Sequence, residues 1–458
     1  MYIYLNFIFL ISFYIFISFK CIANELPKTV SYIVTDGNCC GGEESDPHAV
    51  HGIQANDGSY ILSGKSLDKS GKENGFIIKI PGNLTIEKYF LNPDEEYNLE
   101  WSFILGSNNK KDGINASAVL SNSVFIAGYL ENSKGVIDRY LGKLDIFNGE
   151  LIWEIILPSK NKKLESAFES ILITEDKGII LTGVVNADKG SIEGFKSYGN
   201  PQDGNAFGMF FSSDDIKTNN KPINPLWEVH YKNSLSGKSI KELQNKKGFV
   251  IATSTIEEPR ISKVIKINTK GNIIWEKTYP VHGEITDISV TNDSYYISGH
   301  KKDNLGGIDG SISKISNDGS LIWNKSYGNP KGGDNKFKNS GKGNRKLIFD
   351  ECWSITSTDD GAIMACGTGI EGCEEFEGSL LKECLKDPRK TWRSYLIKIN
   401  NDGDLIWEKT GSFTFPGEEN EEDVPSTASE WIFQTQNGNF ASVVDLGFGV
   451  GLEILTDN

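Results

Sequence analysis

The sequence predicts an all-β fold: a β-propeller of seven four-stranded antiparallel blades, with the ring closed by the N-terminal strand. Three observations predict it. One apolar strand phrase recurs along the chain, turns rich in Gly and Asn separate the apolar segments, and helical periodicity is missing between them. The copies read YILSGK, VFIAGY, IILTGV, FVIATS, YYISGH, IMACGT and FASVVD. Six or eight blades stay open as alternatives, because two longer insertions have room for further strands.

Each unit is expected to contain four strands in a fixed order. A strand such as VHGIQA or CWSITS comes first, a turn such as NDGS or TDDG follows, and the apolar phrase comes next. A third strand such as GFIIKI or SYLIKIN leads into a second turn and then into a strand that carries a tryptophan. Gly, Asn and Asp tolerate the positive φ angles of tight hairpin turns. The expected outer-strand tryptophans, which we interpret as structural, are Trp101, Trp153, Trp227, Trp275, Trp323 and Trp407.

The N-terminal strand supplies the outer strand that the last unit lacks. The sequence KTVSYIVT at residues 28–35 precedes the first unit, and the last unit ends at GLEIL without a tryptophan strand of its own. Pairing these two ends closes the ring and removes the open sheet edges. We therefore expect residues 24–458 to form one propeller domain, with residues 28–35 as closing strand of the last blade and residues 367–392 as an inserted loop that contains cysteines.

The first 23 residues are predicted to be a signal peptide. Residues 2–19 are apolar apart from Asn6 and serines, and Ala23 is a small residue suited to cleavage. An uncleaved membrane anchor is the alternative, because about 18 apolar residues approach the length of a transmembrane helix. Contact with a membrane is expected only in that case. Either way, the rest of the chain is predicted to be secreted or extracytoplasmic.

Cysteine usage agrees with that compartment. Beyond Cys21 there are the adjacent Cys39 and Cys40 and a cluster at Cys352, Cys366, Cys373 and Cys384. Paired Cys-x-x-Cys spacing, typical of zinc sites, is missing, so disulfides are favoured. Cys352 and Cys366 fall opposite each other on the first two strands of a blade and predict a cross-strand disulfide. Cys373 and Cys384 are expected to staple the inserted loop, and the partners of the adjacent pair are not assigned.

Charge and short motifs narrow the partners. The formal net charge of −15 opposes binding to nucleic acids, and the sequence contains no basic stripe. Asn-x-Ser/Thr sequons predict glycosylation at Asn83, Asn115, Asn292 and Asn324 if the source is eukaryotic. The expected partner is therefore a protein or a glycan, and the chain is expected to be a monomer.

A Gly-x-x-x-Trp phrase marks the second turn and the outer strand of several units. Its clearest copies pair Gly149 with Trp153, Gly271 with Trp275, Gly319 with Trp323 and Gly403 with Trp407. In this phrase the units resemble the repeats of quinoprotein-like (pyrroloquinoline-quinone-type) β-propellers. The resemblance covers about residues 47–457 by spacing and implies a propeller fold. In the quinone enzymes the cofactor lies over the centre of the ring, and no quinone- and calcium-binding set can be assigned here.

The remaining motifs have simpler interpretations. GTGIEG at residues 367–372 lacks the following helix that a dinucleotide site needs. His48 and His51 lie three apart in a predicted strand and so face opposite sides. Gly-x-Ser-x-Gly is absent from the sequence. Calcium is the one cofactor considered, at turns that contain Asp203, Asp309 and Asp334, although turn chemistry explains these residues without an ion.

We predict from these observations a secreted β-propeller that acts as a non-catalytic binding or scaffold module, without an assigned catalytic, cofactor or metal residue. The alternative is an extracellular enzyme with a site at the axial channel, either a quinone-type oxidoreductase or a carbohydrate-active hydrolase or lyase. Propeller faces are assembled from loops of several blades, so ligand-binding residues need not be close in sequence.

Overall fold

The fold is described from a computed structural model. It describes residues 27–36, 46–67, 73–82, 99–106, 110–192, 203–217, 224–302, 307–328, 348–370, 377–379, 381–382, 391–411, 426–446 and 449–456.

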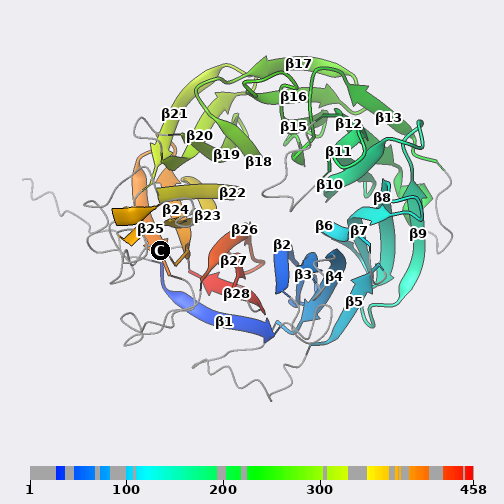
Figure 1. Ribbon diagram of the computed structural model, residues 1–458, viewed down its shortest axis with the longest axis horizontal. Coiled ribbons are helices and arrows are strands. Elements are labelled where there is room, and N and C mark those ends of the chain that lie inside the picture. The colour runs from blue at the N-terminus through cyan, green and yellow to red at the C-terminus, as the bar shows by residue number, and fades with distance from the viewer. Residues whose placement is uncertain are drawn as a thin grey trace, which may run out of the picture.

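The described chain is a ring of antiparallel sheets, and Figure 1 looks along its axis. The innermost strands are β2 (Asp46–Gln54), β6 (Asp112–Leu120), β10 (Glu165–Ile173), β14 (Ser239–Glu242), β18 (Glu284–Val290), β22 (Ile348–Thr358) and β26 (Ala428–Gln434). The second strands are β3 (Tyr60–Leu67), β7 (Ser123–Glu131), β11 (Ile179–Ala187), β15 (Gly248–Ser254), β19 (Ser294–Lys302), β23 (Gly361–Ile370) and β27 (Phe440–Asp445). All seven copies of the apolar phrase are thus strands.

The outer half of each sheet completes the ring. The third strands are β4 (Glu73–Ile80), β8 (Ile137–Asp145), β12 (Asn205–Phe211), β16 (Ser262–Asn268), β20 (Ile308–Ser316), β24 (Arg393–Asn400) and β28 (Gly449–Leu455). The outermost strands are β1 (Thr29–Asp36), β5 (Trp101–Leu105), β9 (Leu151–Leu157), β13 (Trp227–Tyr231), β17 (Ile273–Thr278), β21 (Leu321–Tyr327) and β25 (Leu405–Thr410). One short helix, α1 (Ser213–Lys217), lies between β12 and β13.

The count of separate sheets differs from the expectation. Five sheets of four strands stand alone, and the strands from β18 to β25 are joined in one eight-stranded sheet. The junction is a single parallel pair between Ile308 of β20 and Phe349 of β22. The β-propeller of four-stranded antiparallel blades is therefore confirmed, but seven separate four-stranded sheets are not found. The physical reason is local, since the start of β20 lies within hydrogen-bonding reach of the start of β22.

The first and the last described strands pair with each other, as the sequence predicts. Strand β1 pairs antiparallel with β28, from Thr29 opposite Leu455 to Asp36 opposite Gly449. The sheet order is β1, β28, β27 and β26, so the first described strand becomes the outer strand of the last sheet. The closing strand is shifted by one residue from the expected range 28–35. Strand β23 continues to Ile370, so the segment expected to loop out from residue 367 leaves its strand later.

The outer-strand tryptophans hold neighbouring sheets together. Trp227 donates its indole N–H to the carbonyl of Thr269 at 3.0 Å, in the turn before β17. Gly271 in that turn has φ +79°, and a Cβ added there would lie 2.8 Å from the Trp227 ring. Glycine is therefore required both by backbone conformation and by close contact. The same contact recurs between Trp101 and Gly149, Trp275 and Gly319, and Trp323 and Gly403.

Among the described residues, two other tryptophans make a different contact. Trp153 packs with Phe125 and with Ile216 of α1 in one hydrophobic cluster. Trp407 packs with Phe440 and Leu455, next to the seam between the chain ends. The aromatic packing is retained at both positions, although the glycine turn is replaced by a helix in one case and by the seam in the other.

The inner strands are joined by hydrogen bonds next to β-bulges. Asp287, just after the bulge of β18, accepts a hydrogen bond from the backbone N–H of Ile355 at 3.1 Å. Ser354, just after the bulge of β22, accepts one from the N–H of Ile432 at 3.4 Å. A bulge frees one residue from the ladder and re-aims its neighbours. These polar side chains thereby tie each inner strand to the next one around the ring.

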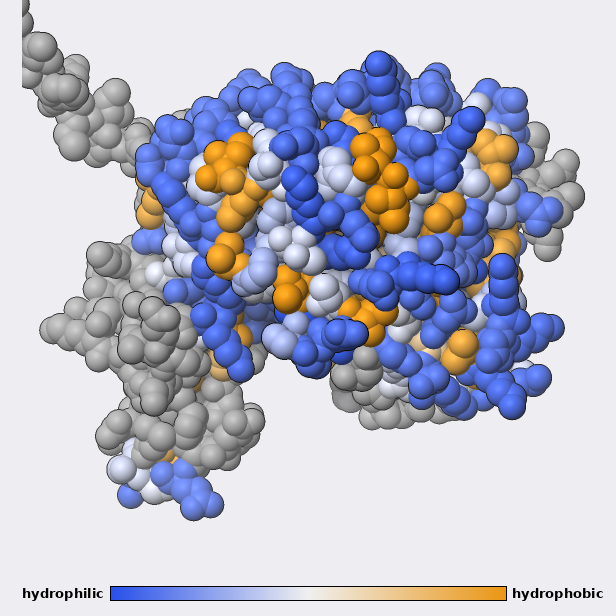
Figure 2. Space-filling view, turned by 90° about the horizontal axis from the view of Figure 1, so that it is seen from above, coloured by the Kyte–Doolittle hydropathy of each residue, from blue (hydrophilic) through white to orange (hydrophobic). Residues whose placement is uncertain are grey.

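The rim of the ring is mixed in character. Figure 2 shows hydrophobic side chains gathered in separate clusters among hydrophilic ones. The exposed aliphatic residues of β17 and β21 are Ile273, Ile274, Leu321 and Ile322. They directly precede Trp275 and Trp323, whose rings turn toward the adjacent blade. The aliphatic residues directly before Trp275 and Trp323 are therefore exposed, whereas the two tryptophan rings pack against the adjacent blade.

Candidate functional site

The centre of the ring is filled at one end. Lys241 of β14 places its amine 5.2 Å from the ring centroid of Trp431 of β26. The sheets that contain these strands lie on opposite sides of the axis in Figure 1, so the contact spans the centre. His51 lies 4.5 Å from the same indole between ring centroids, and the Lys241 amine lies 3.7 Å from a carboxylate oxygen of Asp287. A hollow of about 320 Å³ lies at this end, lined in part by Lys241 and Trp431.

The hollow at the filled end is largely apolar. Its wall includes Ile173, Val290, Ile355, Ile432 and Phe433. These residues lie at or near the C-terminal ends of their inner strands. Apart from Lys241 and Glu242, no charged side chain lines it among the described residues.

A larger cavity opens at the other face of the ring, at the beginnings of β18 and β22. Its volume is about 630 Å³, within the range of about 300–1,000 Å³ typical of ligand sites. Its described lining is mostly polar or charged: Ser254, Glu258, Pro259, Arg260, Ser262, Gly283, Glu284, Ile285, His300, Lys301, Lys302, Ile308 and Glu351. The wall is thus built by four segments that are far apart in sequence.

The wall nearest the axis carries two carboxylates and one imidazole. Glu284 begins β18, Glu351 lies near the start of β22, and His300 lies near the end of β19. A carboxylate oxygen of Glu284 lies 3.5 Å from Nε2 of His300. Burial alone lowers the pKa of His300, but the hydrogen bond and charge of Glu284 and the charge of Glu351 raise it above its usual value. The imidazole is therefore the internal counter-ion of this wall.

Burial shifts the pKa of the Glu351 carboxyl in the opposite direction to that of His300. Burial raises its pKa above the usual value, the charge of His300 lowers it, and the charge of Glu284 raises it further. One imidazolium therefore faces two carboxylates.

The cations of the cavity are engaged with neighbouring groups. Lys301 donates to the carbonyl of Val281 at 3.0 Å and to Asn324 Oδ1 at 2.7 Å. Arg260 Nε lies 3.0 Å from a carboxylate oxygen of Glu258, in the connection between β15 and β16. Arg260 thus lies on the β15–β16 connection and Lys301 on β19, whereas the carboxylates Glu284 and Glu351 lie on the inner strands β18 and β22.

His282, two residues before Glu284, is a different kind of histidine. It is fully buried, and its Nδ1 lies 2.9 Å from Ser313 Oγ. Burial lowers its pKa to about 3, so it is neutral in the folded protein. Its role is structural, whereas His300 faces a cavity and charged partners.

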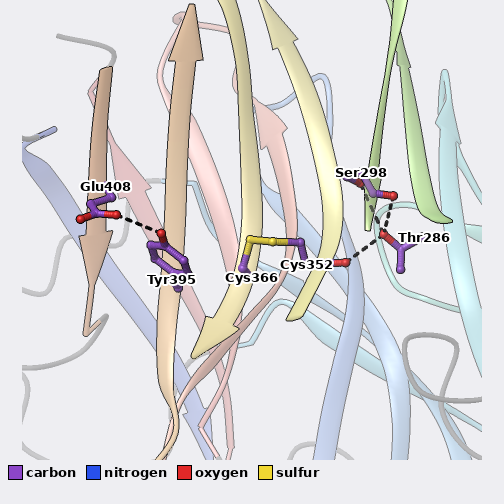
Figure 3. The surroundings of a disulfide bond; sticks show 6 residues. All are labelled: Thr286, Ser298, Cys352, Cys366, Tyr395 and Glu408. Atoms are coloured by element: carbon purple, nitrogen blue, oxygen red, sulfur yellow. Dashed lines mark hydrogen bonds between the residues drawn. A yellow bond between two sulfur atoms is a disulfide. The ribbon is translucent and has the colours of Figure 1, made fainter. Parts of the chain in front are cut away.

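The structure joins Cys352 and Cys366 by a disulfide, as the sequence predicts (Figure 3). Their Cα atoms lie 3.9 Å apart, directly opposite in the β22–β23 register. Figure 3 also shows Thr286, which donates to the carbonyl of Cys352 at 2.9 Å. Because Glu351 precedes Cys352, this crosslink lies beside the cavity wall. Cys373, Cys384, Cys39 and Cys40 lie outside the described residues.

The predicted glycosylation positions differ in their surroundings. Asn115 is buried, and its amide donates to the carbonyl of Phe168 at 2.8 Å, so the folded protein has no room for a glycan there. The prediction of glycosylation at Asn115 is corrected, because the bulge of β6 turns this side chain toward β10. Asn324 is partly buried and bound to Lys301, whereas Asn292 is exposed in the β18–β19 turn. Asn83 lies outside the described residues.

The residues considered for calcium are not brought together. Asp203 accepts hydrogen bonds from the backbone N–H of Asp188, at 2.9 and 3.1 Å, and so caps a turn. Asp309 lies in β20, in a different sheet, and Asp334 lies outside the described residues. His48 and His51 contact different groups, Asp445 and Ser117. Within the described ranges, no three His, Cys, Asp or Glu residues are arranged to hold a metal ion.

The cavity residues escaped prediction from sequence. Glu284, Glu351 and Arg260 carry no motif, and they meet only because the ring brings the starts of two inner strands beside a loop. The one sequence feature that could have identified the two glutamates is their position in the repeat. Both glutamates stand two residues before a bulge of an inner strand, at equivalent places in successive repeats.

Comparison with known proteins supports the fold alone. No family model and no curated protein matches the chain. Hydrazine synthase of Kuenenia stuttgartiensis aligns with TM-score 0.51 and 9% identity, over 89% of this chain and 95% of that one. BamB of Moraxella catarrhalis aligns with TM-score 0.40 and 9% identity, over 94% and 100%. Quinohemoprotein alcohol dehydrogenase of Comamonas testosteroni aligns with TM-score 0.43 and 9% identity, over 88% and 66%.

The class that these observations define is the β-propeller fold. The Gly-x-x-x-Trp phrase serves the fold, since it positions a turn and docks an indole between blades.

Proposed function

We propose that this protein is a non-catalytic binding module that holds a segment of a partner protein in the 630 Å³ cavity at the starts of β18 and β22. One observation carries the proposal. A charged cavity of about 630 Å³ opens beside the inner strands, whereas the hollow around Lys241 and Trp431 at the other end of the centre is about half that volume and largely apolar.

The chemistry of the lining favours a protein segment over a glycan. Among the described lining residues there is no aromatic side chain on which a sugar ring could stack. There are instead charged groups of both signs, two serines, and the apolar Pro259, Ile285 and Ile308. A peptide offers backbone hydrogen-bonding groups, charges and small apolar side chains together, so it complements such a surface.

Blocking the cavity tests the proposal. Ile308→Trp places a large ring in the cavity, and Ile274→Trp places the same ring on the exposed rim as a matched control. Wild-type protein is applied to an array of immobilised peptides of varied sequence and charge. We expect a subset of peptides to be bound, the rim variant to retain this binding and the cavity variant to lose it. Unchanged binding by the Ile308→Trp variant would refute the assignment of the cavity.

An acid–base enzyme is the second candidate function. It is favoured by one observation, the position of Glu351 in the cavity beside Glu284 and His300 with its pKa raised by burial, because a carboxyl group with a raised pKa is better suited to act as a general acid. A panel of soluble polysaccharides tests it. Release of reducing ends or unsaturated products by the wild type, abolished in Glu351→Gln, would replace the binding proposal by a hydrolase or lyase.

We also infer that the ring has seven blades, with the eight-stranded sheet counted as two. The groups β18–β21 and β22–β25 are each antiparallel throughout, and a single residue pair joins them. Each group also repeats the strand order of the separate sheets. An experimental structure that showed continuous pairing along β20 and β22 would contradict the count.

Secretion belongs to the same proposal. A disulfide at Cys352 and Cys366 supports an oxidising compartment. Within the described parts of the chain, no helix combines the length and the apolar character needed to cross a bilayer. We propose that residues 1–23 are removed as a signal peptide, that the product is a monomer, and that Asn292 is glycosylated if the source is eukaryotic. N-terminal sequencing of the mature protein checks the cleavage, and an N-terminus at Met1 would contradict it.

A further inference from the structure

We propose that the disulfide between Cys352 and Cys366 positions the wall of the cavity, and that the cavity binds its partner segment only while this crosslink holds three strands together. The inference rests on the proposed binding function and adds the group that keeps the binding site in shape.

Cys352 contacts two strands of the neighbouring blade as well as its own. Its carbonyl accepts a hydrogen bond from Thr286 Oγ1 of β18 at 2.9 Å. A Cβ built on Gly310 of β20 would lie 2.6 Å from the Cys352 sulfur, so the lack of a side chain at this glycine lets β20 approach the disulfide. Cys352 thus lies where β18, β20 and β22 meet.

Each of these three strands contributes a lining residue close to its contact with Cys352. Glu284 of β18 and Ile308 of β20 lie two positions before the residues that touch Cys352, and both line the cavity. Glu351, which also lines the cavity, immediately precedes Cys352 in β22. Loss of this common anchor would therefore let the three lining residues move independently.

The disulfide connects the junction to the buried outer half of its sheet (Figure 3). Cys366 lies opposite Cys352 in β23 and opposite Tyr395 in β24. The Tyr395 hydroxyl donates to Glu408 of β25 at 2.9 Å. Cys352, Cys366 and Tyr395 belong to one hydrophobic cluster, and all three are fully buried. The wall is thereby tied through a covalent bond to the core of the sheet.

Backbone pairing near the wall leaves this tie with a specific task. One residue pair, Ile308 with Phe349, joins β20 to β22. The ladder between β22 and β23 shifts register between Cys352 and Ser354. A bulge leaves a residue unpaired and bends its strand, so hydrogen bonds alone constrain the start of β22 less than a regular ladder would. The crosslink fixes the register at this point.

His300 reports the shape of the wall without any ligand. Burial lowers the pKa of this imidazole, and Glu284, Glu351 and the backbone of Cys352 raise it above its usual value. A wall that opens to solvent therefore returns the pKa of His300 toward about 6.5. The buried His282, whose pKa is about 3, is the internal control and should stay neutral at pH 5.

The test uses the full-length mature protein and an NMR titration of its labelled histidines. Thr286→Val removes the hydrogen bond to the Cys352 carbonyl and keeps the disulfide. Thr291→Val removes a hydroxyl that is bonded within the turn at the other end of the β18–β19 pair, and it is the matched control. We expect the pKa of His300 to fall toward about 6.5 in Thr286→Val and to stay unchanged in Thr291→Val.

Replacement of both cysteines by alanine should have the larger effect. The pKa of His300 should fall further than in Thr286→Val. A peptide that the wild type binds on the array should bind about tenfold more weakly, because a loosened site is no longer preorganised. Trp431→Ala, which destabilises the other end of the centre, should bind this peptide as the wild type does.

Two outcomes overturn the positioning role. One is an unchanged pKa of His300 in Thr286→Val, a variant that keeps the test decisive if the protein without both cysteines fails to fold. The other is unchanged peptide binding in the folded protein that lacks both cysteines. Failure of the wild type to bind any peptide of the array would instead overturn the proposed function, while the titration of His300 would still decide whether the disulfide shapes the wall.

Discussion

The two ends of the propeller's centre use the same inner strands in opposite ways. Toward the C-terminal ends of the strands, Lys241 reaches across the axis to Trp431, and aliphatic side chains line a hollow of about 320 Å³. At their N-terminal ends, Glu284 and Glu351 face a cavity of about 630 Å³. The repeated backbone is common to both ends. The difference teaches that strand repeats define the ring, while individual side chains at the strand ends decide whether an end is packed or open.

The largest expected effect comes from breaking the packed end. Trp431 is 8% exposed and contacts both His51 and Lys241. Trp431→Ala should lower the free energy of unfolding by about 3–5 kcal/mol, as for other large aromatic truncations in cores. Chemical denaturation measures it. Binding in the cavity should survive under native conditions, and its loss in the folded variant would show that the two ends are not independent.

The disulfide beside the cavity should have the next largest effect. Cys352 and Cys366 are separated by 14 positions, and a crosslink of this span stabilises a fold by about 3 kcal/mol. Replacement of both cysteines by alanine should lower the free energy of unfolding by about that amount. Denaturation of the oxidised, reduced and doubly substituted proteins measures it. Equal stability of oxidised and reduced wild type would contradict the prediction.

The two neighbouring histidines should give opposite pH dependences. His282 has its pKa lowered to about 3 by burial, so the unfolded chain binds a proton that the folded one refuses. Stability is therefore lost as pH falls below about 6.5, by about 2 kcal/mol between pH 7 and pH 5. Urea denaturation at the two pH values measures this loss. His282→Gln should reduce it, and an unchanged slope in that variant would contradict the assignment.

His300 should act in the other direction and more weakly. Its folded-state pKa is raised by Glu284 and Glu351, so its contribution is present below the unfolded-state pKa and is lost as pH rises through the folded-state value. Because the Glu284 side chain is 39% exposed, solvent screens the pair, and about 1 kcal/mol or less is expected. His300→Gln should therefore destabilise the protein more at pH 5 than at pH 8, as measured by denaturation at both values. A larger cost at pH 8 would reverse the assigned sign.

The sequence predicted the features that follow from repetition and from strand register, and it missed contacts between segments that share no pattern. The apolar phrases, the glycine turns before the tryptophans and the Cys352–Cys366 pair follow from strand periodicity and register. The buried second strands appear as nearly continuous apolar runs because blades cover both of their faces. The single parallel contact between Ile308 and Phe349, which merges two groups of strands into one sheet, leaves no pattern.

The candidate site was beyond prediction for a related reason. Glu284, His300, Glu351 and Arg260 lie on separate segments, and their proximity depends on the curvature of the ring. In the sequence, His282 and His300 look alike, yet one is buried beside Ser313 and the other faces a cavity. Asn115 matches a sequon as well as Asn292 does, and only the bulge of β6 reveals that its amide is buried.

The central claim is that partner binding takes place at the open end of the centre and not at the packed end. Hydrogen–deuterium exchange of the protein with and without a peptide that it binds on the array tests it most directly. We predict slower exchange in the peptide-bound state at the start of β18, the end of β19 and the start of β22, with no change near Lys241 and Trp431. Protection confined to the segments around Lys241 and Trp431 would contradict the account.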